Sequence, residues 1–238
     1  MKKSKLALVA MAGIFCFACE DKPEAKAKPD AAEQNAAEVQ KPVEAQKPAE
    51  VQKPASLTDP RDNKVYKTVA IGKQIWMAEN LNYLYNDDES GNSYVAGTDK
   101  YGALYPPYAA QQVCPKGWHL PSQAEWNELI NFAGGENAAV ALKAKNGWKT
   151  NGTDEFGFSA LPGGFKRWNI GDGDYSEIAT KDVGVAGNWW SSTKVGNDKF
   201  YDFHIDDKPG VRSDKDGCKG NSYDYGDCYL LSVRCVKN

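Results

Sequence analysis

Polar and β-forming residues alternate where the folded part of the chain begins. The stretch 62–69 has the alternation of a half-buried strand. The turn residues Gly72 and Lys73 follow, and the largely apolar stretch 74–77 predicts a second strand, so the two strands should pair as a hairpin. The stretch 86–102 is rich in Asn, Asp, Gly and Ser and predicts a loop.

The clearest helix signal lies at 122–133. Ser122 is a good N-cap, and Glu125 follows at the spacing of a capping box. Gly134 and Gly135 end the run. Between these signals, apolar residues share one face at helical spacing, namely Trp126, Leu129, Ile130 and Ala133.

A second helix and several short strands complete the prediction. Alanines favour a helix at about 137–145. Short β segments are expected at 156–161, 189–193, 199–205 and 229–236, separated by stretches rich in Gly and Asp. The pattern predicts an α+β domain with short antiparallel strands, one or two helices and long loops.

The N-terminus has the pattern of an export signal. Lysines precede an uncharged, mostly apolar stretch at 6–17. A helix of that length spans about 18 Å, too short for a hydrocarbon core of roughly 30 Å, so a signal peptide at 1–18 fits and a transmembrane helix does not. A small residue followed by Cys19 resembles the bacterial lipobox, in which the cysteine becomes the lipidated first residue. The alternative is ordinary signal cleavage, with Cys19 incidental.

Residues 19–56 predict a disordered tether. Past Cys19, the segment consists largely of Glu, Lys, Ala, Pro and Gln and has no aromatic residue, so it cannot bury enough apolar surface to offset its chain entropy. Pro42, Pro48 and Pro54 recur at a fixed spacing, which prevents a continuous helix and favours extended geometry. We expect a spacer that holds a folded domain, residues 57–238, away from a lipid anchor in the membrane.

The cysteines of the folded region predict two disulfides. They are Cys114, Cys218, Cys228 and Cys235, an even set in an exported chain. Four cysteines allow three pairings. Local spacing favours Cys218–Cys228, which closes a short loop, and Cys114–Cys235 would then tie the helical unit to the last strand. A zinc site is the alternative, but the paired Cys-x-x-Cys spacing that it favours is absent from the sequence.

Five ordered blocks carry a family resemblance. They are 75–81, 117–126, 157–164, 189–193 and 232–236, which read IWMAENL, GWHLPSQAEW, GFSALPGG, WWSST and SVRCV. Together they resemble the Fibrobacter succinogenes major paralogous domain family over roughly residues 57–238. The resemblance implies a C-type-lectin-like fold, which also includes the sulfatase-modifying domains. It implies the same cysteine order, in which a cysteine entering the helical unit pairs with one in the final strand and a smaller pair lies just upstream.

Composition and motifs argue against an enzyme and against nucleic-acid binding. A net charge of −3 provides no basic field. His119, in the helix-entry block, is expected to satisfy backbone groups, and His204 to be half-exposed in a strand; neither has an evident Ser or Cys partner. The sulfatase-modifying relatives depend on active-site cysteines, whereas the cysteines here have a structural assignment. Glu125 with Asp154 or Glu155 would form an acid/base pair for glycoside hydrolysis, yet Glu125 is already explained as a cap.

We expect no cofactor, with calcium as the one metal hypothesis. Oxygen ligands interleaved with glycines, as in a loop Ca²⁺ site, occur at Asn169, Asp172, Asp174 and Glu177. Ordinary Asp-Gly turn chemistry is the simpler interpretation of this segment.

Aromatic residues beside Gly-, Asp- and Asn-rich segments are the remaining binding candidates. Their flat faces suit stacking on sugar rings, and they are Trp168, Tyr175, Trp189, Tyr201, Tyr223 and Tyr225. Trp118, Trp126 and Trp190 lie in the motif blocks and are expected in the core. These features predict a non-catalytic polysaccharide-binding or adhesion module on an outer-membrane or cell-surface lipoprotein. An envelope scaffold that contacts other proteins, and an enzyme of the sulfatase-modifying type, are the alternatives.

Overall fold

The computed structural model describes the folded region of the chain. The described residues are 55–85, 96–98, 100–168, 179–196, 199–218 and 228–238. They belong to one compact unit, 48–238, whereas the other unit, 1–47, lies outside them. The predicted signal peptide, Cys19 and nearly all of the predicted tether are therefore outside the described residues. No helix within the described ranges is long and apolar enough to cross a membrane.

The first sheet contains the predicted hairpin. Its order is β1–β2–β3–β12–β6, from Ala55–Thr58 (β1), Val65–Ile71 (β2), Gln74–Met77 (β3), Val236–Lys237 (β12) and Trp118–His119 (β6). β2 and β3 pair antiparallel, with Val69 opposite Trp76. Gly72 turns the chain between them at a φ of 61°, and a Cβ there would lie 3.1 Å from the Phe132 ring. The turn therefore needs glycine for its backbone angle and for space.

The second sheet is formed mainly by the C-terminal half of the chain. Its order is β10–β9–β8–β11–β5–β4, with β7 also pairing with β11, from Ala96–Thr98 (β4), Gly102–Tyr105 (β5), Lys166–Trp168 (β7), Gly187–Lys194 (β8), Lys199–Ile205 (β9), Arg212–Gly217 (β10) and Cys228–Ser232 (β11). The strands predicted at 189–193 and 199–205 are confirmed. The segment predicted at 229–236 divides into β11 and β12, one in each sheet.

Two predictions fail locally. The predicted loop 86–102 contains β4, and the predicted strand 156–161 is a loop with one bridge, at Ala160. Asp154 and Ser159 have positive φ, and the Asp154 carboxylate accepts hydrogen bonds from the Ser159 amide and hydroxyl, both at 2.7 Å. This side-chain clasp replaces the ladder that an extended segment would have formed.

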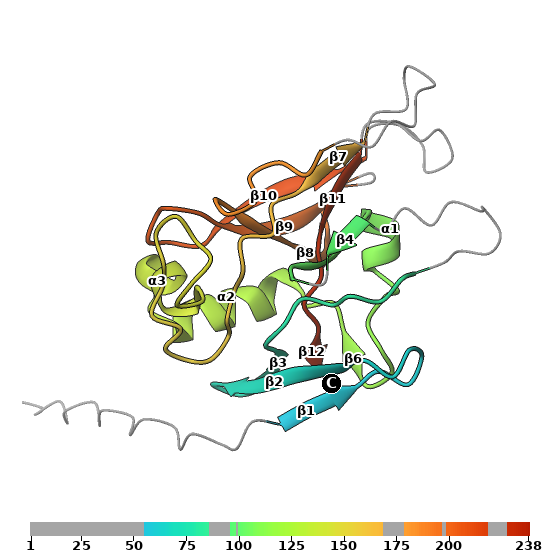
Figure 1. The fold of residues 1–238 in the computed structure, drawn as a ribbon, viewed down its shortest axis with the longest axis horizontal. Coiled ribbons are helices and arrows are strands. Elements are labelled where there is room, and N and C mark those ends of the chain that lie inside the picture. The colour runs from blue at the N-terminus through green and yellow to red at the C-terminus, as the bar shows by residue number, and fades with distance from the viewer. Residues whose placement is uncertain (1–54, 86–95, 99, 169–178, 197–198, 219–227) are drawn as a thin grey trace, which may run out of the picture. The chain divides into compact units, whose positions relative to one another are not determined.

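The helices lie between and beside the two sheets (Figure 1). They are Pro107–Ala110 (α1), Gln123–Phe132 (α2) and Ala138–Leu142 (α3), with a 3-10 turn at Gly135–Asn137. The predicted capping box is confirmed, because Ser122 Oγ accepts from the Glu125 amide and the Glu125 side chain accepts from the Ser122 amide. Gly134 has a φ of 107° and ends α2, as predicted. The second helix is shorter than predicted because Lys143 is extended.

Two apolar clusters form the core. In the first, Trp126 on α2 stacks on Phe203 of β9, with ring centroids 5.1 Å apart, and contacts Trp76 of β3 at 4.9 Å. α2 thus joins the two sheets through one buried indole. The second cluster surrounds Tyr105 and Trp190. The prediction that Trp126 and Trp190 are core residues is confirmed, whereas Trp118 is only partly buried. The observed architecture agrees with the predicted α+β class.

Both disulfides have the predicted pairing. Cys114–Cys235 joins the segment after α1 to the residue before β12, across a sequence separation of 121. Cys218–Cys228 joins the residue after β10 to the first residue of β11, across a separation of 10. The first bridge closes a loop of about two thirds of the folded region, and in the chain-entropy account closing such a long loop stabilises the fold by roughly 4–5 kcal/mol.

A buried arginine holds the chain where it passes from one sheet to the other. Arg234 is fully buried and lies between β11 and β12. Its Nε and Nη2 donate to Asn80 Oδ1 at 3.1 and 2.9 Å, and Nη1 donates to the Phe158 carbonyl. The guanidinium also lies over the Phe158 ring, 4.2 Å from its centroid. Burial lowers the pKa of Arg234 to about 9, while Asp154 and Glu79 act in the opposite direction.

Asn80 is the common partner in this network. Its Oδ1 also accepts from Trp189 Nε1 at 2.8 Å, and its Nδ2 donates to the Tyr101 carbonyl at 2.8 Å and to Ser232 Oγ at 3.2 Å. Gly102 allows this approach, because a Cβ there would lie 2.7 Å from the Asn80 Cβ. We refer to Asn80, Trp189 and Arg234 as the Asn80–Arg234 network.

We predict that Asn80→Ala is far more destabilising than Ser232→Ala. The first change leaves a buried guanidinium and a buried indole N–H without their acceptor, which should lower the free energy of unfolding by about 3–5 kcal/mol. The second removes one longer bond, while Asn80 keeps the Tyr101 carbonyl, and should cost about 1 kcal/mol. Urea denaturation of both variants measures the difference. Equal losses would contradict the role given to Asn80.

Candidate functional site

The structure corrects the predicted set of sugar-binding aromatics. Trp189 has no exposed surface and packs in the first core cluster, so its prediction as a ligand-binding residue is wrong. The reason is its register: it lies opposite Phe203, whose side chain also faces that cluster. Tyr201 is partly buried at the edge of the same cluster, with Lys215 Nζ 5.6 Å from its ring centroid. The backbone of Trp168 ends β7, opposite Cys228.

The other candidates lie outside the described residues. They are Tyr175, Tyr223 and Tyr225 of the aromatic set, Asn169, Asp172, Asp174 and Glu177 of the calcium hypothesis, and Cys19. Within the described ranges, no group of three or more His, Cys, Asp or Glu side chains is arranged to hold a metal ion.

The helix entry brings a serine, a glutamate and a histidine together without forming a nucleophilic triad. Glu125 Oε2 accepts from Ser122 Oγ at 2.8 Å, and Glu125 Oε1 lies 2.7 Å from His119 Nε2. Burial would raise the pKa of Glu125, but hydrogen bonds from Ser122 and His119 lower it. The carboxylate therefore stands between the hydroxyl and the imidazole, whereas a triad needs the imidazole next to the hydroxyl. His119 pairs with Glu125 and Asn238 side chains and not with the backbone groups expected.

A buried aspartate lies at the centre of strand β9. Asp202 is 2% exposed and lies opposite Trp190 on β8 and opposite Asp214 on β10. Since side chains alternate along a strand, it points away from the face of Phe203 and Ile205, which line the first core cluster. Its Oδ1 has no hydrogen-bond partner among the described residues.

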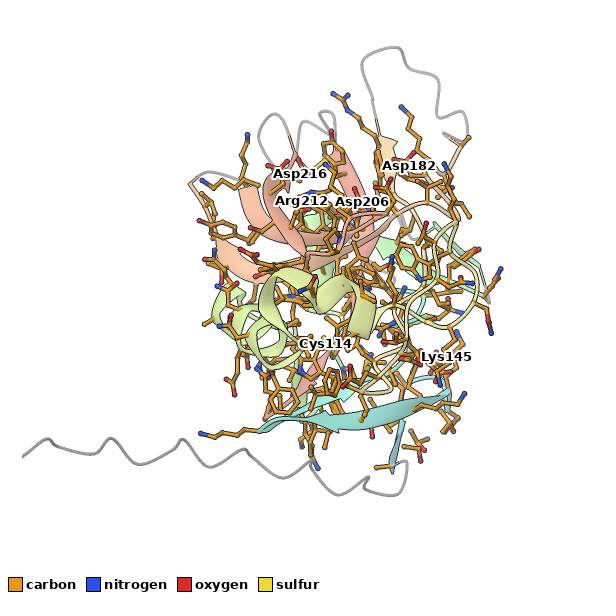
Figure 2. The ribbon with its side chains drawn as sticks, turned by 90° about the vertical axis from the view of Figure 1, so that its left-hand side faces the viewer. Cys114, Lys145, Asp182, Asp206, Arg212 and Asp216 are labelled. Atoms are coloured by element: carbon orange, nitrogen blue, oxygen red, sulfur yellow. A yellow bond between two sulfur atoms is a disulfide. The ribbon has the colours of Figure 1, made fainter. Side chains whose placement is uncertain are left out.

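The surroundings of Asp202 oppose its ionisation. Burial, then the carboxylates of Asp216 and Asp214, raise the pKa of Asp202 to about 7, while hydrogen bonds from the Asp202 and Asp216 backbone amides act in the opposite direction. Burial and Asp214 also raise the pKa of Asp216, while Lys199 and Arg167 lower it. We call Asp202, Asp214 and Asp216 the acidic ladder. Figure 2 shows Asp216 at the end of the domain that also carries Arg212 and Asp206.

Aromatic side chains border the acidic ladder on the β11 side. Tyr229 on β11 is partly buried, and its ring centroid is 5.7 Å from that of Phe165. The Arg167 guanidinium lies 5.6 Å from the Tyr229 centroid and acts on Asp216. We call Phe165, Arg167 and Tyr229 the aromatic edge. The Cys218–Cys228 disulfide joins β10 to β11 next to this edge, since Tyr229 follows Cys228 directly.

His204 is a strand residue with a defined partner. It is half-buried, and its Nε2 accepts from Arg212 Nε at 2.8 Å. Burial and then Arg212 lower the pKa of His204. Arg212 in turn pairs with Asp206 through two nitrogens, and this bonding lowers the pKa of Asp206 to about 2. The group is a surface ion pair at the far end of β10, and the prediction of a half-exposed sheet histidine is confirmed.

Sequence reasoning missed both the acidic ladder and the aromatic edge. The signal for the ladder was an aspartate between two aromatic residues in the predicted strand 199–205, with alternating aspartates in 212–217. A strand pattern alone gives no register between β9 and β10, so it could not place Asp202 opposite Asp214. Phe165 and Tyr229 lie 64 positions apart in the chain and meet only through the pairing of β7 with β11.

The fold and these contacts define a disulfide-bonded α+β domain whose motif blocks meet in its core. The sequence model of the Fibrobacter succinogenes major domain matches residues 69–237. The match covers more than half of the chain, and the protein belongs to this family. Comparison with curated proteins and with solved structures finds no match.

The family blocks have a structural role in the described region. Asn80, Phe158, Trp189, Ser232 and Arg234 come from four of the five blocks and meet in or beside the Asn80–Arg234 network. The remaining block provides Trp126 and the capping box. The side chains of the acidic ladder and the aromatic edge, by contrast, all lie outside the five blocks.

We predict that Asp202→Asn stabilises the domain at neutral and alkaline pH and flattens its pH dependence. The folded-state pKa near 7 lies above the ordinary value near 4. The stability contributed by the proton is therefore fully present below about pH 4 and is lost as the pH rises toward 7. Three pKa units correspond to at most about 4 kcal/mol, so a gain of about 2–4 kcal/mol is expected at pH 8.

Denaturant unfolding at pH 5 and pH 8 checks this prediction. Asp207→Asn, a change at a neighbouring exposed aspartate, serves as the matched control and should follow the unmodified protein. A pH slope that is unchanged in Asp202→Asn would show that Asp202 does not retain its proton.

Proposed function

We propose that this protein is an exported lipoprotein that displays a non-catalytic binding module at the outer membrane or cell surface. The N-terminal lysines, the short apolar stretch and Cys19 support export and lipidation. The Pro-containing segment that follows supports a spacer between the anchor and the domain. The two disulfides favour an oxidising compartment.

We further propose that the domain has a C-type-lectin-like fold. The support is the cysteine order: one disulfide ties the helical unit to the last strand, and a smaller one lies just upstream of that strand. Two sheets joined by a ten-residue helix also suit such an architecture. Fold by itself does not assign a ligand.

The aromatic edge is the observation that favours a carbohydrate ligand. Phe165 and Tyr229 are partly buried, so packing holds their rings close together while each residue keeps some solvent-exposed surface. Aromatic faces pack against the C–H groups of sugar rings, and an adjacent guanidinium or carboxylate can hydrogen-bond hydroxyl groups. Arg167 provides such a group beside the Tyr229 ring and interacts electrostatically with the half-buried Asp216.

An enzyme of the sulfatase-modifying type has no comparable support. That chemistry requires free cysteine thiols, and the four cysteines of the domain are joined in the two disulfides. An envelope scaffold that contacts other proteins would use the same exposed edges, and the binding experiment below separates it from a glycan-binding module.

We predict that the protein is retarded in gels that contain xylan or hydroxyethyl cellulose, and that the aromatic edge causes the retardation. The double variant Phe165→Leu/Tyr229→Leu loses two ring faces, which should weaken binding about tenfold. Affinity electrophoresis measures the effect. Phe132→Leu is the matched control, because Phe132 is an exposed aromatic residue on α2.

If the double variant and the control are retained equally, the aromatic edge is not the binding site. No retention on either polymer or on a glycan array, together with protein partners in a pulldown, would favour the scaffold.

We predict that Cys19 is the lipidated residue. Cells that express the protein and are fed an alkyne fatty acid should incorporate the label into it, and Cys19→Ser should abolish the incorporation. Cys16→Leu provides the control, since it removes the other cysteine of the N-terminal segment while keeping an apolar residue before Cys19, and it should not reduce labelling. Label that survives in Cys19→Ser would contradict the anchor.

A further inference from the structure

We propose that the acidic ladder is a proton-operated control of the aromatic edge. A proton on Asp202 keeps β10 paired with β9. Loss of that proton weakens the pairing of β10 and displaces Arg167 relative to Tyr229. The identity of the controlled site rests on the proposed function, whereas the loosening of β10 is a property of the domain without ligand.

The first step is the cost of a charge at position 202. The side chain is almost fully buried, and one of its oxygens has no partner among the described residues. Hydrogen bonds from the Asp202 and Asp216 backbone amides favour the charged form, but burial and the two neighbouring carboxylates outweigh them. A buried carboxylate whose hydrogen bonding is incomplete is disfavoured and takes up a proton instead. The neutral carboxylic acid is therefore the form that suits the packed strand.

The second step is the repulsion across the strand pair. Asp214 lies directly opposite Asp202 in the β9–β10 register, and Asp216 is the next residue on the same face of β10. Like charges at directly opposed positions destabilise a strand pair. Ionised Asp202 would face two carboxylates on β10, an edge strand that pairs with β9 alone in the sheet order. The repulsion would therefore weaken the pairing of β10 with β9.

The third step concerns the charges that surround the ladder. From β8, Trp190 faces Asp202 with a neutral side chain, whose Nε1 donates to the Tyr105 carbonyl at 2.7 Å. Lys199 at the start of β9 and Arg167 on β7 act on Asp216. His204 is the next residue on the Asp202 face of β9, and it pairs with Arg212, whose other partner is Asp206.

These neighbours separate the titration of Asp202 from that of His204. Burial and Arg212 lower the pKa of His204 below its ordinary value of 6.5, while burial and the two aspartates raise the pKa of Asp202 to about 7. A change between pH 6 and pH 8 therefore reports mainly on the ladder and not on the histidine.

The fourth step is transmission to the aromatic edge, for which the structure provides two routes. Electrostatically, Asp216 interacts with Arg167, which lies over the Tyr229 ring. Covalently, β10 leads into Cys218, which is bonded to Cys228, the residue before Tyr229. A shift of β10 is thus passed to the strand that carries Tyr229.

The choice of aspartate supports a switching role. Asparagine has nearly the same shape as a protonated aspartic acid and would avoid the charge, so an aspartate at this position lowers stability at neutral pH without an evident packing benefit. Groups whose pKa is shifted to near neutrality by burial and like charge are common at functional sites.

Hydrogen–deuterium exchange of the full chain at pH 6 and pH 8, corrected for intrinsic rates, tests the proposal without ligand. In the unmodified protein, the protection factor of peptides that cover 212–217 should be about tenfold lower at pH 8 than at pH 6. A tenfold change corresponds to one pKa unit of coupling between the Asp202 proton and the pairing of β10 with β9. Asp202→Asn should remain protected at both, and Asp207→Asn should behave like the unmodified protein.

Three results would overturn the proposal. They are protection of β10 that is equal at pH 6 and pH 8, a loss that persists in Asp202→Asn, and a loss that millimolar Ca²⁺ abolishes. The last result would show that a cation, and not a proton, compensates the ladder.

Affinity electrophoresis on xylan at pH 6 and pH 8 tests the link to binding. Retention should weaken about tenfold at pH 8 in the unmodified protein and stay constant in Asp202→Asn. Retention that does not depend on pH would contradict the proposal that the proton on Asp202 regulates binding. Absence of retention at both pH values, together with the expected exchange behaviour, would instead reject the carbohydrate ligand and leave the proton-dependent loosening established.

Discussion

The passage of the chain from one sheet to the other depends on a single buried guanidinium. Residues 233–235 connect β11 in the second sheet to β12 in the first, and the Val233 and Cys235 carbonyls accept from the Leu81 and Met77 amides at 2.9 and 3.0 Å. Arg234 lies between these two backbone bonds in the chain, and its guanidinium donates hydrogen bonds to residues from other parts of the domain. Its acceptors are one amide oxygen, on Asn80, and backbone carbonyls. The charge therefore lies among dipoles and an aromatic face, and no carboxylate in the described part of the chain bonds to it directly. Such a site is stable only if every partner is in place.

The same domain contains a second buried charge site that is built in the opposite way. Arg234 has all of its partners, whereas one oxygen of Asp202 has none among the described residues. The first site lies in the family blocks and fixes the scaffold; the second lies outside them, near a sheet edge. In our proposal the core network provides rigidity, and the ladder with the aromatic edge provides binding and its control.

How much could be predicted from the sequence depends on the range of each signal. The capping box of α2 was predictable because Ser122 and Glu125 are neighbours in one helical turn. The disulfides were predictable because few pairings exist and their spacing is unequal. The error at Trp189 has a different origin. Trp189 and Trp190 face opposite sides of β8, and strand alternation suggests that only one side is covered, but an apolar cluster lies on each side of this strand.

The rest of the site depends on the register between strands, which cannot be predicted from the local sequence. Asp202 looks like an exposed polar residue in an alternating strand, and only the placement of β8 and β10 on either side buries it. The loop at 156–161 was predicted as a strand because its composition is apolar, whereas the Asp154–Ser159 clasp determines its backbone. The burial of Asp202 depends on tertiary contacts that override local preference, whereas the loop depends on a local hydrogen-bonded contact between two residues five positions apart.

Amide hydrogen exchange at Met77 and Leu81, measured by NMR at increasing low concentrations of denaturant, tests the central claim most directly. If the Asn80–Arg234 network fixes the crossing segment, both amides open only when the whole domain unfolds. Their opening free energies and denaturant slopes should then equal those of global unfolding. Opening of these amides at a lower free energy than those of the β2–β3 hairpin, with little dependence on denaturant, would show that the crossing segment moves independently and would contradict the account.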